Sequence, residues 1–136
     1  MFRILTIALV GLSLASAAEA RNRLAPNGAL VLFETKTDDN FRVLGRAGFG
    51  PRDYYCAAGY FARVTLRARP TDRVVLTRPP TRSDRTVGFE LVRNPAKQPF
   101  LNRDVVLRLR EPGQSRTVGH ARNLCEQFRF GINNND

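Results

Sequence analysis

Two cysteines constrain the fold of this chain more than any other feature of its sequence. Cys56 lies in a proline-led stretch with apolar residues at helical spacing, and Cys125 lies near the C-terminal end. Since the chain has only these two, a single intramolecular pairing is available. A disulfide would close a loop of about 70 residues and stabilise the fold by about 4 kcal/mol in the chain-entropy account. Two buried free thiols are the alternative. No metal site is predicted, because two cysteines and one histidine lack the ligand count and spacing of a zinc site.

The N-terminal segment has the three parts of an export signal. Arg3 gives a positive start, residues 4–14 form an apolar run, and a small-residue cleavage site ends at Ala20, with an alternative ending at Ala17. The run is shorter than the roughly 20 apolar residues of a membrane span. We therefore expect residues 1–20 to be a cleaved signal peptide. The mature chain is expected to be periplasmic or secreted, without a transmembrane segment, in a compartment where disulfides persist.

The mature chain, residues 21–136, has the length of one globular domain, and its polar end at 131–136 is expected to fray. Helical spacing of apolar residues predicts two helices, and branched or alternating runs bounded by turn residues predict strands. The fold class is therefore α+β, with about five mainly antiparallel strands, two helices packed on one face, and one disulfide that links the helices. The expected strands cover 29–35, 41–44, 73–78, 87–92 and 104–110. Asn27-Gly28 is an expected turn, and residues 36–40 are expected to connect the first two strands in an antiparallel hairpin. The expected helices run from Pro51 to Leu66 or Arg67, with Asp53 in the first turn, and from a cap at Ser115 or Thr117 to about Gln127.

The chain carries a net charge of +10, and nearly all of its 22 basic residues are arginines. Arginine suits bidentate contacts with phosphate and carboxylate, and a positive field steers anionic partners towards the protein. The period-two pattern of residues 104–110 places Arg108 and Arg110 on a solvent face. These two residues and Arg116 are the candidate anion-binding residues, and anionic envelope polymers or lipid head groups are the candidate partners. The alternative is that the arginines only keep a small exported domain soluble.

Nucleic acid is a disfavoured partner, because export removes the usual targets and the aromatic residues cluster on a predicted core helix. The glycine-rich loop before Pro51 is a second candidate anion site, since backbone amides at a helix N-terminus bind phosphate. The spacing of Gly45, Gly48 and Gly50 is not a dinucleotide fingerprint, and proline removes one amide. A tight strand-to-helix turn is the favoured explanation, and no cofactor is predicted.

His120 is the only histidine and defines the enzymatic alternative. A small basic ribonuclease needs a histidine acid, a carboxylate base and an arginine for the phosphate. The chain offers His120, Glu90 or Glu111, and Arg108, but no signature links them. No catalytic residue is therefore assigned. The favoured hypothesis is a small exported non-enzymatic module that binds anionic envelope components through surface arginines, with the phosphodiester-cleaving enzyme as its alternative.

One motif resembles a known group of proteins. The run Gly50-Pro51-Arg52-Asp53-Tyr54-Tyr55-Cys56-Ala57-Ala58-Gly59, together with Ala121 to Cys125, is similar to small exported proteins of alphaproteobacteria that have no known activity. The similarity covers most of the mature chain, and a tryptophan often stands in that group where this chain has Tyr55. The resemblance implies a disulfide scaffold and brings no catalytic residue with it.

Overall fold

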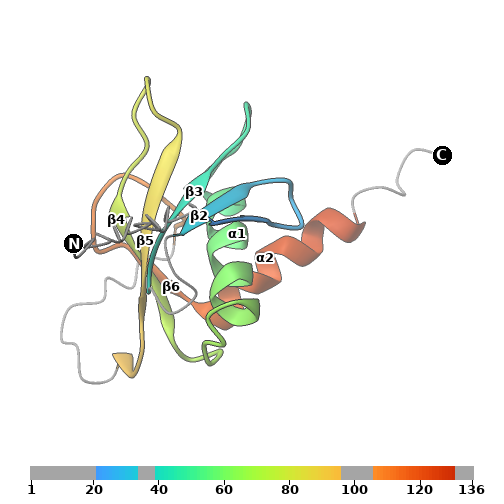
Figure 1. Cartoon of the computed structure of the whole chain (residues 1–136), viewed down its shortest axis with the longest axis vertical. Coiled ribbons are helices and arrows are strands. Elements are labelled where there is room, and N and C mark those ends of the chain that lie inside the picture. Colours follow the sequence, from blue (N-terminus) through green and yellow to red (C-terminus); the bar gives the residue numbers. More distant parts are fainter. Residues whose placement is uncertain (1–20, 34–38, 96–105, 131–136) are drawn as a thin grey trace, which may run out of the picture.

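Six short strands and two helices make up most of residues 21–33, 39–95 and 106–130, the part of the chain that the computed structural model describes (Figure 1). All strand pairs are antiparallel, and the order across the sheet is β1-β2-β3-β5-β4-β6. The predicted α+β class with two helices is confirmed. The elements are β1 (Arg21–Leu24), β2 (Leu30–Phe33), β3 (Asn40–Leu44), α1 (Pro51–Val64), β4 (Arg73–Arg78), β5 (Thr86–Val92), β6 (Ser115–Thr117) and α2 (Val118–Phe130).

The core lies between the sheet and α1. In β3, Phe41 and Val43 are buried while their neighbours are exposed, which is the alternation expected of a strand with one covered face. Phe61 of α1 lies on this face, with its ring centroid 4.8 Å from that of Phe41 and 4.9 Å from that of Phe33. These tilted ring contacts, with Phe89 of β5 beside Phe41, form the aromatic centre of the core.

The N-terminus of α1 is satisfied by its own first turn. The backbone N–H of Gly50 donates to Oδ2 of Asp53 at 2.8 Å, and Pro51 occupies the first helical position, where no N–H is needed. The Asp53 carboxylate also complements the positive end of the helix dipole. The sequence expectation of a proline-led helix with an acidic first turn is confirmed.

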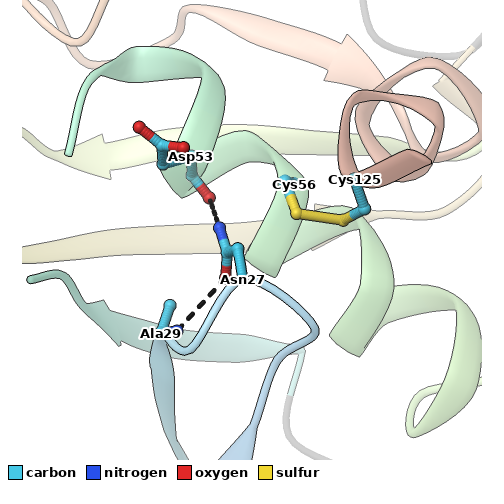
Figure 2. The surroundings of a disulfide bond; sticks show 5 residues. All are labelled: Asn27, Ala29, Asp53, Cys56 and Cys125. Carbon is cyan, nitrogen blue, oxygen red and sulfur yellow. Dashed lines mark hydrogen bonds between the residues drawn. A yellow bond between two sulfur atoms is a disulfide. The ribbon is translucent and has the colours of Figure 1, made fainter. Parts of the chain in front are cut away.

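The disulfide joins the two helices, as Figure 2 shows. Cys56 and Cys125 are bonded with a Cα–Cα distance of 4.9 Å, and their exposed fractions are 0% and 7%. Close contact between the helices depends on Gly59. A Cβ added there would lie 2.5 Å from the backbone nitrogen of Arg122 and 2.6 Å from Cβ of Ala121. The predicted pairing is therefore present, at a point where the helix backbones approach closely.

The β1–β2 turn is attached to α1 beside the disulfide (Figure 2). Nδ2 of Asn27 donates to the carbonyl of Asp53 at 2.8 Å, and Oδ1 of the same side chain accepts from the N–H of Ala29 at 3.2 Å. Gly28 follows with φ +82°, a conformation that favours glycine. The Asn27-Gly28 turn predicted from sequence therefore also fixes the start of the helix.

The predicted strand at 104–110 is wrong over its described residues, because 106–110 forms no strand. The place beside β4 is taken by β6, whose residues 115–117 pair with Arg73 to Val75. Ser115 and Thr117 were the two expected caps of the second helix, which starts at Val118, directly after Thr117. The predicted cap is present, since Oγ1 of Thr117 accepts from the N–H of His120.

The strand β1 was not predicted from the sequence, because its four residues are mostly polar. The antiparallel hairpin predicted around residues 36–40 is confirmed by the pairing of β2 with β3. The signal peptide at 1–20, the tail at 131–136 and positions 104–105 lie outside the described residues. Within the described ranges, neither helix has the length and apolarity to cross a membrane.

Candidate functional site

A pocket of about 610 Å³ lies at one end of the sheet. Strands β3 and β4 both run antiparallel to β5, so the ends of β3 and β4 and the start of β5 meet there. The loop after β3 leads directly into α1, and the segment 106–110 closes the remaining side. The pocket is lined by Arg46, Gly48, Phe49, Gly50, Pro51, Tyr54, Pro80, Arg85, Val106, Leu107, Arg108, Leu109 and Arg110.

Among the described residues, four arginines and no carboxylate contribute to this lining. Arg46 comes from the loop after β3, Arg85 from the residue before β5, and Arg108 and Arg110 from the extended segment. All four are exposed. Two ion pairs in the described part of the chain, Arg78–Asp84 and Arg93–Asp39, involve other arginines. The pocket therefore concentrates positive charge around a concave surface, which favours an anion.

The floor of the pocket is apolar and continuous with the core. Phe49, Leu107 and Leu109 are partly buried against the core cluster, and the Phe49 ring meets the Tyr54 ring edge-on at 5.9 Å. Leucines and arginines alternate from 107 to 110, so the leucines lie on the floor and the arginines lie exposed. The side of each residue is thus as the sequence predicted, although the segment is not a strand.

Tyr54 occupies the boundary between core and pocket. Its hydroxyl donates to the backbone carbonyl of Arg85 at 3.0 Å. Burial raises the pKa of Tyr54, with smaller opposing effects from the Arg85 charge, which lowers it, and from Asp53, which raises it. Gly45 makes room for this ring, because a Cβ there would lie 2.2 Å from the phenolic oxygen. Tyr54 therefore stays neutral and acts as a hydrogen-bond donor at physiological pH.

Gln114 holds the extended segment in place. Its side chain is buried, and Oε1 accepts from the N–H of Arg110 at 2.9 Å and from the N–H of Glu111 at 3.1 Å. The backbone around it is tied to β4, since Leu76 exchanges hydrogen bonds with Gln114 and Gly113, each at 2.8 Å. These bonds replace a strand ladder and fix the position from which Arg108 and Arg110 extend.

The glycine loop has the structural role that the sequence analysis favoured. The N–H of Gly50 is bonded to Asp53, and Pro51 has no N–H to offer. Gly48 adopts φ +85°, which explains a glycine in the turn. The helix N-terminus therefore carries its own carboxylate, and the positive charge of the pocket comes from arginine side chains.

The structure does not place Arg116 with Arg108 and Arg110. It pairs with Val74 on the face of the sheet that α1 covers, and it is only 9% exposed. Its guanidinium carbon lies 5.9 Å from the centroid of the Tyr55 ring, and Nη1 donates to the carbonyl of Ser115 at 2.7 Å. Such a cation–π contact stabilises a buried arginine within the protein itself.

Sequence reasoning missed Arg46 and Arg85. Neither lies in a motif, and their proximity to residues 108–110 depends on the crossover from β3 through α1 to β4. The only local signal was the position of Arg46 between two glycines of the loop.

The residues of the ribonuclease alternative are not assembled in this pocket. Arg108 lines it, but His120, Glu90 and Glu111 do not. Glu90 lies between Phe89 and Leu91, which face α1, so its side chain is on the opposite face of the sheet. His120 is exposed in the first turn of α2. Across the described residues, no group of three or more His, Cys, Asp and Glu side chains is placed to hold a metal ion.

We found no family model, curated protein or solved structure that matches the chain. The chemistry of the pocket is therefore the basis for a function. Its described lining offers several guanidinium groups, no carboxylate and an apolar floor.

Proposed function

We propose that this protein is a small exported binding module, without enzymatic activity, that binds anionic components of the cell envelope. One observation carries the proposal: arginines from three separate segments converge on one pocket, whose lining within the described part of the chain contains no carboxylate. The disulfide and the signal-like N-terminus support an extracytoplasmic location, because disulfides persist in oxidising compartments.

The arginines suit phosphate or carboxylate recognition. Each guanidinium offers a planar fork of donors that binds two oxygens of an anion at once. A single exposed ion pair contributes about 0–1 kcal/mol, so one arginine would bind an anion weakly. Four in one pocket act on the same ligand, and the net charge of +10 adds long-range attraction. The pocket volume falls in the range of about 300–1,000 Å³ that is typical of small-ligand sites, and therefore suits a head group or a single polymer unit.

A pair of charge-matched variants tests the pocket against net charge alone. The pocket variant carries Arg85→Gln, Arg108→Gln and Arg110→Gln. The control carries Arg42→Gln, Arg69→Gln and Arg82→Gln, three exposed arginines outside the pocket. Both variants lose the same charge, so they differ only in where the charge is lost.

Binding is measured by titration calorimetry with polyphosphate and with vesicles that contain phosphatidylglycerol. We expect the pocket variant to bind one of these probes about tenfold more weakly than wild type, a loss of about 1.4 kcal/mol, and the control to stay within about twofold. Wild-type affinity should fall steeply with added salt. Equal losses in the two variants, or no binding at low salt, would leave only the solubility explanation.

The enzymatic alternative has its own test. Because the described residues of the pocket include no histidine and no carboxylate, wild type and His120→Ala should show the same background rate on an RNA substrate. RNA cleavage by wild type that is lost in His120→Ala would replace the binding proposal with the enzyme.

A further inference from the structure

The apolar part of the pocket is not explained by charge recognition. Seven of its lining residues are apolar or aromatic, and Val106 among them is 55% exposed. A surface that binds only a hydrated polyanion gains nothing from such a floor, whereas exposed apolar surface in a concave site commonly marks contact with an apolar ligand group. The apolar and aromatic lining residues are Phe49, Pro51, Tyr54, Pro80, Val106, Leu107 and Leu109.

The two kinds of side chain are separated within the pocket. Leu107 and Leu109 are half-buried against the core, while Arg108 and Arg110, which alternate with them, are exposed. In the loop after β3, Phe49 is partly buried and Arg46 is exposed. The pocket therefore has an apolar floor and a cationic rim, which is the complement of a molecule with an apolar chain and an anionic head.

We infer that the pocket binds a single-chain anionic lipid, with the acyl chain on the apolar floor and a phosphate head on the rim arginines. This inference rests on the proposed anion-binding function and narrows its ligand class. The phosphate accepts bidentate hydrogen bonds from the guanidinium groups. The chain covers Val106 and the exposed edges of Leu107 and Leu109, removing apolar surface of both partners from water.

The test uses alkyl phosphates of increasing chain length as probes, from butyl to dodecyl, at concentrations below micelle formation. Inorganic phosphate serves as the head group alone and dodecyl maltoside as the chain alone. Each methylene that becomes buried should tighten the dissociation constant by up to about fourfold. We expect dodecyl phosphate to bind far more tightly than either inorganic phosphate or dodecyl maltoside.

A variant of the exposed apolar lining locates the chain. Val106→Ser replaces a side chain that is already half-exposed, so it should leave the fold intact. Leu24→Ser is the matched control, since Leu24 is 65% exposed on β1 and lies outside the pocket. Val106→Ser should weaken dodecyl phosphate binding about fivefold and leave binding of inorganic phosphate or polyphosphate unchanged. The control should change neither.

The outcomes separate the two proposals. Affinity that depends on the pocket arginines but not on chain length would overturn the lipid inference and leave the proposed anion binding intact, with polyphosphate as the favoured probe. Affinity that follows chain length but is unchanged in the arginine pocket variant would overturn both. Equal effects of Val106→Ser and Leu24→Ser would likewise exclude the apolar floor as the chain site.

Discussion

The first turn of α1 (the open end) and the turns that follow it from Tyr55 to Phe61 (the buried end) have very different surroundings. From Tyr55 to Phe61 the helix is almost entirely buried, tied to α2 by Cys56 and packed on the sheet through Phe61. Its first turn is half-exposed and borders the arginine pocket. Stability should therefore depend on the buried end and ligand binding on the open end. The predictions below test this division, beginning with the largest expected effect.

Removal of the disulfide should affect the buried end alone. The bond closes a loop with a sequence separation of 69 residues, so Cys56→Ala with Cys125→Ala should lower the free energy of unfolding by about 4 kcal/mol. Chemical denaturation measures this loss. The fraction that is still folded should bind polyphosphate as wild type does. A loss of less than about 1 kcal/mol would show that helix packing does not need the bond.

Two glycine substitutions compare the ends directly. Alanine at Gly59 would clash with the backbone of α2, and alanine at Gly45 would clash with the Tyr54 hydroxyl. Each should cost about 1–3 kcal/mol by overpacking. Only Gly45→Ala should also weaken ligand binding, because it displaces a ring that lines the pocket. Equal binding by the two variants would contradict the division between the ends of α1.

Gln114→Ala should loosen the open end with a smaller cost in stability. The substitution leaves the backbone N–H groups of Arg110 and Glu111 without the side-chain acceptor they have in wild type. The expected loss is about 1–3 kcal/mol. Ligand affinity should fall as well, because Arg108 and Arg110 lose a fixed position. Titration calorimetry measures the loss of ligand affinity, and the midpoint of thermal unfolding measures the loss of stability. Unchanged affinity would show that Gln114 does not position the arginines.

The smallest effect concerns Tyr54 and pH. Loss of the hydrogen bond to Arg85 in Tyr54→Phe should cost about 0.5–1.5 kcal/mol near neutral pH. Because burial raises the pKa of Tyr54, its contribution to stability is complete below the unfolded value of about 10 and is lost as pH rises through the folded value. The stability difference between wild type and Tyr54→Phe should therefore shrink in strongly alkaline solution. A difference that grows would mean that the folded pKa is lowered.

The sequence was sufficient for the parts of the fold that local chemistry determines. The proline-led helix, the single cysteine pairing and the strands β3, β4 and β5 follow from side-chain pattern, and the structure confirms them. It was insufficient for β1, an edge strand whose polar residues carry no alternation and whose place depends on backbone pairing with β2. Residues 106–110 alternate like a strand because one side faces the core, yet β6 holds the pairing edge of β4.

The candidate site was predicted only in part, because some of its residues come together only through the topology of the sheet. Arg108 and Arg110 stand out locally because they alternate with leucines. Arg46 and Arg85 join them through the crossover between β3 and β4, which no local pattern encodes. Arg116 lies between the polar residues Ser115 and Thr117 in sequence, but the strand that contains it turns this side chain towards Tyr55.

The most direct test of the account follows individual residues by NMR during titration with dodecyl phosphate. The account predicts shifts at the backbone amides of Phe49 and Leu107 and at the side-chain Nε–H groups of the pocket arginines, with little change around Cys125. Shifts spread equally over exposed arginines outside the pocket, such as Arg42, Arg69 and Arg82, would contradict a defined site and reduce the charge to a general property of the surface.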